Sequence, residues 1–274
     1  IDNSLAHRTT WLRSDFATDI IEDFMLLANE TVAEDYFWQE IPFLYRTHET
    51  PDSDKIKKLD TFIHNFGYYM KTGRENFHPK EIQKLLFSLE GEPEEPLISR
   101  LALRSMKQAK YTTLNVGHFG LSTQYYTHFT SPIRRYPDLQ IHRIIKENIH
   151  GKLNQKRLEH YEAILPSVAQ QSSTMERRAQ DAEREVDKLK KVEYMQQYLG
   201  EAFTGVISGV TSWGFFVELD NTIEGMVPIN SLLDDFYVFD EESYKLTGEH
   251  TGRIFTLGQK VEIVVRSADQ MERT

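Results

Sequence analysis

Residues 128–139 read HFTSPIRRYPDL, and this segment decides how the rest of the chain is interpreted. Pro137 favours the first turn of a helix, because proline has no backbone N–H to leave unpaired there, and residues 140–149 continue with helical spacing. Arg134 and Arg135 stand just before that turn. The free N–H groups of a helix N-terminus and the guanidinium groups both attract anions, so the segment predicts an anion site.

Phosphate is the anion that suits this combination of groups best. A guanidinium group can donate two parallel hydrogen bonds to a phosphate, and the hydroxyls of Thr130 and Ser131 can donate to the same oxygens. A structural alternative stays open, in which Arg134 and Arg135 only pair with nearby acids such as Asp138.

The charge distribution supports a confined site for a polyanion. The 274 residues carry a net charge of −10, which by itself disfavours a polyanionic partner. Residues 101–160, however, contain ten Lys and Arg against three Asp and Glu, whereas residues 1–100 and 200–274 each carry a net −8. A basic segment inside an acidic chain indicates a groove for phosphates and not a protein that coats nucleic acid.

Composition narrows the class of protein. The chain is long enough for two domains, and 39% hydrophobic residues are normal for a globular protein. It has no cysteine, which excludes disulfides, thiolate metal sites and cysteine nucleophiles. No apolar run approaches the roughly 18 residues of a membrane span, and no signal peptide is visible, so we expect a cytoplasmic protein without a membrane partner.

Helical periodicity dominates the chain up to about residue 199. Apolar residues are dense enough over 19–38 to predict a mostly buried helix, on which Glu22 is costly unless it is used or paired. Further helices are expected at 51–70, capped by Ser53, at 79–89, 97–108 and 166–199, with strand or extended loop at 111–128. The helix over 166–199 carries a narrow apolar stripe, so packing on the preceding domain, a coiled-coil dimer and an interaction scaffold all stay open.

From residue 201 the pattern changes to alternation. Five short strands are expected at 203–210, 214–219, 223–229, 253–255 and 260–268, which suits an OB-fold barrel. Trp213 and Phe216 are placed to stack RNA bases, while Phe215 is the better candidate for the barrel core. Asp234, Asp235 and the acids at 240–242 are expected to be a solvated charge run and not metal ligands.

Three stretches carry a resemblance to a known family. Residues 111–143, YTTLNVGHFGLSTQYYTHFTSPIRRYPDLQIHR, resemble the end of the catalytic domain of the ribonuclease II / ribonuclease R family. Residues 21–29, IEDFMLLAN, resemble its helix that lines the RNA channel, and residues 201–258 resemble its terminal S1 domain. The resemblance is closest to the ribonuclease R branch, although Pro228 stands where the family often has a histidine.

The resemblance implies an α+β fold. The expected architecture is a largely helical C-terminal portion of an RNB-type catalytic domain over residues 1–199, followed by a five-stranded antiparallel OB-fold barrel of the S1 type over residues 200–274. The implied activity is processive 3′-to-5′ hydrolysis of single-stranded RNA to nucleoside 5′-monophosphates, with Mg²⁺ as cofactor in a two-metal mechanism. Other RNA-processing or ribosomal components would be further partners.

Site residues are carried over by position. Arg134 matches the family's catalytic arginine near the scissile phosphate, and the RNA-contacting set is expected to comprise Glu22, Thr130, Ser131, Arg135, Tyr136, Trp213 and Phe216. Glu22 has the alternative of neutralising Arg134 or Arg135. A two-metal mechanism leaves little for a general base to do, so His118 and His128 are expected to be structural or to contact RNA.

The family's metal-binding aspartates have no match in this sequence, so no metal ligand is predicted here. We therefore expect a fragment that binds RNA weakly and does not cleave it, the Mg²⁺ ligands belonging to the full-length parent. The alternative is a non-catalytic RNA-binding module with an S1 domain.

Overall fold

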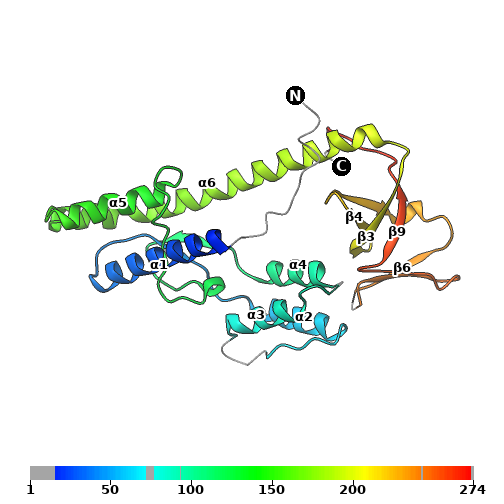
Figure 1. The fold of residues 1–274 in the computed structure, drawn as a ribbon, viewed down its shortest axis with the longest axis horizontal. Coiled ribbons are helices and arrows are strands. Elements are labelled where there is room, and N and C mark those ends of the chain that lie inside the picture. The colour runs from blue at the N-terminus through cyan, green and yellow to red at the C-terminus, as the bar shows by residue number, and fades with distance from the viewer. Residues whose placement is uncertain (1–15, 72–76, 93, 242, 273–274) are drawn as a thin grey trace. The chain divides into compact units, whose positions relative to one another are not determined.

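The computed structural model of the protein describes residues 16–71, 77–92, 94–241 and 243–272 (Figure 1). Its contacts divide the chain into two compact units, each assembled from two stretches of sequence. Unit 1 contains Ile1–Pro51 and Lys107–Gln180, and unit 2 contains Asp52–Met106 and Asp181–Thr274. No helix among the described residues is long and apolar enough to cross a membrane.

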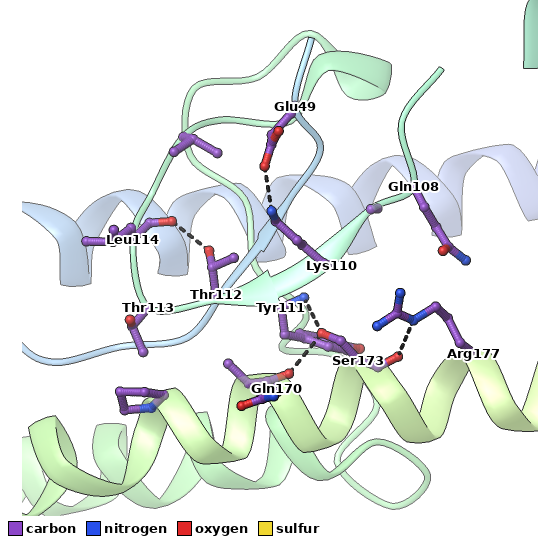
Figure 2. A pocket seen from close by; sticks show the side chains of 14 residues that line it. Glu49, Gln108, Lys110, Tyr111, Thr112, Thr113, Leu114, Gln170, Ser173 and Arg177 are labelled. Atoms are coloured by element: carbon purple, nitrogen blue, oxygen red, sulfur yellow. Dashed lines mark hydrogen bonds and ion pairs between the residues drawn. The ribbon is translucent and has the colours of Figure 1, made fainter. Parts of the chain in front are cut away.

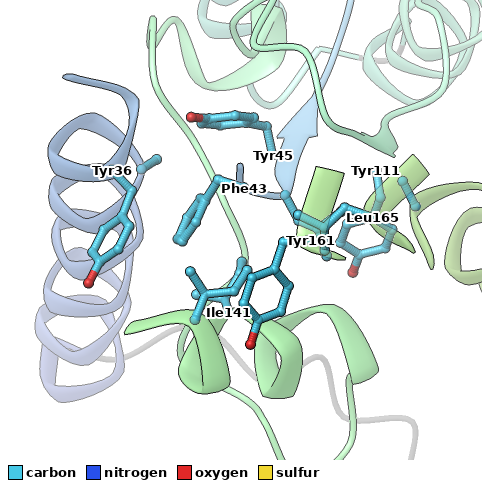
Figure 3. Packing of buried hydrophobic residues seen from close by; sticks show 11 residues of the cluster. Tyr36, Phe43, Tyr45, Tyr111, Ile141, Tyr161 and Leu165 are labelled. Carbon is cyan, nitrogen blue, oxygen red and sulfur yellow. The ribbon is translucent and has the colours of Figure 1, made fainter. Parts of the chain in front are cut away.

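Unit 1 is built around one aromatic and aliphatic core. Its elements are α1 (Phe16–Trp38), β1 (Tyr45–Thr47), β2 (Lys110–Thr112), the 3₁₀ turn η2 (Phe119–Leu121), α5 (Tyr136–Ile149) and the first part of α6 (Gln155–Met195). The short strands β1 and β2 pair antiparallel. Figure 3 shows how the core side chains meet, with Tyr36 of α1 stacked on Phe43 at 4.8 Å and Ile141 of α5 near Tyr161 of α6.

Helix α1 is much more exposed than its sequence predicts. Only Asn29, Ala33 and Tyr36 are buried, whereas Ile21 and Phe24 are 69% and 65% exposed. The expectation of a mostly buried helix is therefore wrong for the described structure. Its apolar residues surround the helix, and the unit 1 core covers only one side of it.

Helix α6 begins eleven residues before Pro166, so Pro166 lies inside the helix and not at its start. The sequence predicts a helix that begins at residue 166, but the buried residues Tyr161, Leu165 and Ala169 hold the earlier turns in the unit 1 core despite the N–H that Pro166 lacks. The predicted apolar stripe is not buried, since Met175 and Val186 are 46% and 55% exposed.

Unit 2 contains three short helices and a β-barrel. The helices are α2 (Ser53–His64), α3 (Pro79–Ser88) and α4 (Glu95–Ser105), all at predicted places. Helix α2 is shorter than expected, and its N-cap is Asp52, whose carboxylate accepts a hydrogen bond from the Asp54 N–H at 2.9 Å. Ser53 is not the cap, because it already lies within the helix.

The barrel has seven strands where the sequence predicts five. They are β3 (Ala202–Thr211), β4 (Gly214–Leu219), β5 (Glu224–Pro228), β6 (Tyr237–Asp240), β7 (Lys245–Gly248), β8 (Ile254–Thr256) and β9 (Lys260–Val264), with η3 (Gln196–Tyr198) before them and η4 (Ile229–Ser231) among them. The sheets run β5-β4-β3-β9 and β6-β7-β8, and every pair is antiparallel. Both sheets contribute to one core that includes Ile207, Val217, Leu246 and Phe255.

The two unpredicted strands, β6 and β7, fall in the acidic segment that was expected to be a solvated loop. Strand β6 buries Tyr237 and strand β7 buries Leu246, both in the barrel core. The surrounding acids hide this alternation in the sequence. Asp235 is itself not a solvated charge, because its side chain is only 1% exposed and accepts from the N–H groups of Phe236 at 2.7 Å and Thr251 at 2.6 Å.

Candidate functional site

A buried carboxylate organises the loop that leads into α5. The side chain of Asp138 is fully buried, and its Oδ1 accepts hydrogen bonds from the Ser131 N–H at 2.8 Å and from Arg135 Nη2 at 2.7 Å and Nε at 3.1 Å. The Ser131 carbonyl in turn accepts from the N–H groups of Arg134 and Arg135. These bonds close residues 131–135 against the first turn of the helix.

The two adjacent arginines consequently have opposite environments. The guanidinium of Arg135 is bonded to Asp138 and the side chain is only 18% exposed. Arg134 is exposed, and its guanidinium forms no ion pair or hydrogen bond with any residue that the structure describes. Arg135 thus pairs with a nearby acid, as in the structural alternative, while Arg134 is available to an external anion.

The remaining loop residues differ in how exposed they are. Ile133 is fully exposed and Tyr136 is half exposed, with the guanidinium of Arg143 5.9 Å from the centre of its ring. The Thr130 hydroxyl is buried and has no hydrogen-bond partner within the described part of the chain. Ser131 is partly buried, and its backbone N–H donates to the buried carboxylate of Asp138.

Asn29 connects α1 to this loop. It is 1% exposed, its Nδ2 donates to the Tyr126 hydroxyl at 3.2 Å, and its Oδ1 accepts from the Phe129 N–H at 2.9 Å. Glu22, two turns earlier on α1, is exposed and forms no ion pair with Arg134 or Arg135. The structure therefore does not bring Glu22 to the arginines, and the residue that links the two elements is one that sequence reasoning missed.

Two partly buried histidines, His118 and His128, precede the loop in sequence. His128 shares a hydrogen bond through Nδ1 with the Tyr111 hydroxyl at 2.8 Å, and His118 Nδ1 accepts from the Leu121 N–H at 3.2 Å. Burial, with the positive charge of Arg135, lowers the pKa of His128 to about 3. Burial, with the neighbouring His48, lowers the pKa of His118 to about 4. Both rings are thus neutral at pH 7 and occupied by internal bonds, which favours a structural role.

An ion pair that was not predicted connects β1 to α6. Arg46 donates from Nη1 and Nη2 to the Glu176 carboxylate at 2.5 and 3.0 Å, and its guanidinium lies 4.7 Å from the centre of the Tyr111 ring. The partners are 130 residues apart, and nothing in the local pattern around either one predicts the pairing.

A groove of about 530 Å³ lies in unit 1 between β2 and α6 (Figure 2). Its side along α6 includes Gln170, Ser173 and Arg177, and the Ser173 hydroxyl accepts from the Tyr111 N–H at 2.9 Å. Arg177 Nε donates to the Ser173 carbonyl at 3.3 Å. None of the predicted site residues lines this groove, so it is separate from the loop at residues 130–136.

The barrel presents the predicted aromatic residues in different ways. Trp213, in the turn between β3 and β4, is 76% exposed. Phe216 is partly buried on the outer side of β4, whereas Phe215 is 2% exposed and stacks on Phe255 with ring centres 4.7 Å apart. Phe215 is therefore the core residue, as the sequence indicated. Gly214 has φ +142°, and an added Cβ would meet the Val227 carbonyl oxygen at 2.1 Å, so only glycine fits this turn.

The described residues do not form a metal site. No group of three or more histidine, aspartate or glutamate side chains converges among them.

Comparisons with known proteins agree with the fold. The model of the RNB domain family matches residues 7–151, and that of the S1 RNA binding domain matches residues 197–273. Ribonuclease R 1 of Lactococcus lactis is 45% identical over 255 residues, covering 93% of this chain and 31% of the relative. Ribonuclease R of Aquifex aeolicus is 45% identical over 252 residues, covering 92% of this chain and 35% of the relative.

Solved structures give the same result. RNase R of Mycoplasma genitalium in complex with ribose methylated single-stranded RNA matches with a TM-score of 0.88 and 28% identity, covering 96% of this chain and 41% of that one. Yeast Ssd1, a pseudonuclease, shares the fold with a TM-score of 0.69 and 24% identity, covering 86% of this chain and 30% of that one. The chain spans about a third of the length of the curated relatives that it matches. Because the RNB model covers more than half of its residues, this chain belongs to the RNB domain family and carries an S1 RNA binding domain after the RNB region.

Proposed function

We propose that this chain is the RNA-gripping part of a 3′-to-5′ exoribonuclease of the ribonuclease R type, with Arg134 as its catalytic arginine. The observation that carries the proposal is the contrast between the exposed, unpaired Arg134 and the adjacent Arg135 that Asp138 holds. A fixed backbone reduces the entropy that binding must remove, and a free guanidinium can donate hydrogen bonds to a phosphate. In the reaction Arg134 neutralises charge that develops on the phosphate near the scissile bond.

The RNA-binding residues are proposed with individual roles. Tyr136 and Arg134 contact the nucleotide directly, since both are exposed on the same loop. Ser131, Arg135 and Thr130 are proposed as further RNA contacts, although the Arg135 guanidinium is bonded to Asp138 and the Thr130 hydroxyl is buried in the free chain. Glu22 contacts the 3′-terminal nucleotide from α1.

The S1 barrel guides single-stranded RNA through base stacking on Trp213 and Phe216. Stacking on aromatic side chains contributes about 1–3 kcal/mol per base and tolerates any sequence. The exposure of Trp213 supports this role. The similarity to RNase R of Mycoplasma genitalium, whose structure contains ribose methylated single-stranded RNA, supports RNA as the ligand.

The parent enzyme is proposed to use Mg²⁺, whose ligands belong to residues outside the described structure. We infer that the chain alone binds RNA and does not cleave it. The domain boundary is placed between residues 199 and 200, with a cytoplasmic location and with other RNA-processing or ribosomal components as further partners.

The test is to incubate the purified chain with a 5′-labelled single-stranded RNA and Mg²⁺, and to measure both binding and product release. We expect binding by the wild type, a roughly tenfold loss of affinity in Arg134→Ala because a charge-assisted hydrogen bond is removed, and no release of nucleotides. Nucleotide release by the chain alone would show that the metal ligands are wrongly placed outside it.

A second function has one observation in its favour. Because the described residues hold no convergent group of metal ligands, the chain could serve as a non-catalytic RNA-binding module. The coding sequence before Ile1 separates the two functions: an aspartate-rich stretch in the same reading frame favours the nuclease, and a start codon directly before Ile1 favours the module.

A further inference from the structure

Two glutamates lie directly opposite each other on the outer side of the barrel. Glu218 of β4 and Glu224 of β5 are register partners, and the inward residues of β4 on either side, Val217 and Leu219, are buried in the core. Like charges directly opposite across a strand pair repel and destabilise the sheet. This pair therefore needs a cation.

Arg100 of α4 supplies the positive charge. Its Nη1 lies 3.0 Å from Glu224 Oε1 and its Nη2 lies 3.3 Å from Glu218 Oε2, so one guanidinium bridges both carboxylates. Ser208 of β3 also donates to Glu224. Burial raises the pKa of Glu224, but the hydrogen bonds from Ser208 and Arg100 outweigh it and hold the pKa below its ordinary value. Glu224 is therefore ionised at neutral pH, and Arg100 is the cation that bridges it to Glu218.

The bridged pair of glutamates stands next to Phe216 on the surface of the barrel. Two residues along the same strands, Phe216 and Met226 are also register partners and also point outward. Without Arg100, two uncompensated carboxylates would stand within about 7 Å of the position where a base could stack. The barrel segment 200–274 already carries a net −8, which repels a polyanion. A cation beside Glu218 and Glu224 reduces this repulsion at the outer face of β4 and β5.

A second arginine follows one helical turn later. Arg104 is exposed and forms no ion pair with any residue that the structure describes. Its positive charge is close enough to contribute to the lowered pKa of Glu224. Since residues four apart share a helix face, Arg100 and Arg104 present their guanidiniums on the same side of α4.

We propose that α4 forms one RNA-binding surface with the outer face of β4 and β5, where Arg100 offsets one of the two negative charges of Glu218 and Glu224 beside Phe216 and Arg104 binds a backbone phosphate. The ligand is single-stranded RNA, whose base lies on the apolar pair while its phosphate faces α4. This inference rests on the proposed RNA-binding function and assigns it a part of the chain outside the S1 segment.

The test compares RNA affinities of the full chain by fluorescence anisotropy with a labelled oligouridine. Arg100→Ala should weaken binding by about three- to tenfold at low salt, because two carboxylates become uncompensated. The double variant Glu218→Gln/Glu224→Gln should bind at least as tightly as the wild type, and adding Arg100→Ala to it should change nothing further. Arg100→Lys should retain most of the affinity, and Lys58→Ala on α2 is the control for loss of one exposed cation from the same unit.

Arg104→Ala should weaken binding and flatten the plot of log affinity against log salt by about 0.7, the contribution of one phosphate contact in a single strand. The inference would be overturned if Arg100→Ala weakened RNA binding equally in the wild type and in the Glu218→Gln/Glu224→Gln variant, or if it weakened binding in neither. The proposed function would remain intact in both cases. A wild-type chain that does not bind the oligonucleotide would overturn both. Thermal melting of each variant separates a folding defect from a binding defect. If Arg100→Ala alone destabilises the packing of α4, its effect on binding is read in the Glu218→Gln/Glu224→Gln variant instead.

Discussion

Arg135 Nη2 lies 2.7 Å from Asp138 Oδ1, while the side chain of Arg134, one residue earlier, forms no ion pair within the described structure. Replacing Arg135 by alanine leaves a buried carboxylate without its cation, so we expect a loss of about 3 kcal/mol in the free energy of unfolding. Arg134→Ala should stay within about 0.5 kcal/mol of the wild type. Urea denaturation measures both, and similar losses in the two variants would contradict the division of roles.

Asn29 should be a strong stability determinant of unit 1. Its side chain satisfies both the Tyr126 hydroxyl and the Phe129 N–H in a buried position. Asn29→Ala leaves those two groups without partners, which should lower the free energy of unfolding by about 2 kcal/mol. Gln171→Ala, an exposed amide on α6, is the matched control and should be neutral. If both variants unfold at the same urea concentration as the wild type, Asn29 does not anchor the loop.

Local patterns predicted much of this fold. Helical spacing located α1 to α5, and the change to alternation located five of the seven barrel strands. The errors arose where burial is decided by distant residues. Apolar density on α1 could not reveal which side meets a core, and Pro166 was read by its local preference although Tyr161 and Leu165 hold the helix through it.

The candidate site shows the same limit. Residue type and spacing identified Arg134 and Arg135 as cations before a helix, but only the fold distinguishes the free guanidinium from the one bonded to Asp138. Asn29 is 97 residues from Tyr126 in sequence, and a single buried asparagine has no local signature. The acidic neighbours of Asp235 predict a solvated side chain, whereas its carboxylate accepts hydrogen bonds from the N–H and the hydroxyl of Thr251.

Trp213 and Phe215, two residues apart, should separate RNA binding from folding. Trp213 is exposed, so Trp213→Ala should leave the stability unchanged and weaken RNA binding by about 1–3 kcal/mol, the energy of one stacked base. Phe215 is in the barrel core, and Phe215→Ala should cost about 3–5 kcal/mol of stability because it removes a buried aromatic ring. Anisotropy should therefore change in Trp213→Ala, and thermal melting should change in Phe215→Ala. If Trp213→Ala bound RNA as tightly as the wild type, Trp213 would not belong to the RNA-binding surface.

The partly buried histidines His118 and His128 should make unit 1 sensitive to mild acid. In the folded chain the pKa of His128 is lowered to about 3 and that of His118 to about 4, whereas unfolded histidine titrates near about 6.5. Between these values the unfolded state binds more protons than the folded state, so stability is complete above about pH 6.5 and falls as the pH decreases toward the folded pKa values. Each histidine can contribute a slope of up to about 1.4 kcal/mol per pH unit.

Carboxylates complicate the lower part of this range, because groups such as Glu49, whose pKa is lowered to about 2 by hydrogen bonds from Lys110 and Lys107, also lose stabilising charge in acid. Unfolded glutamate is half protonated near about pH 4.5 and almost fully ionised above about pH 5.5, so between about pH 5.5 and 6.5 the change in stability comes mainly from the histidines. Urea unfolding at several pH values in that interval should give a shallower slope for His128→Gln than for the wild type. His64→Gln is the control, since this histidine is partly exposed on α2. An unchanged slope in His128→Gln would mean that the ring takes up a proton equally well in the folded chain, and the hydrogen bond to Tyr111 would then not hold it neutral.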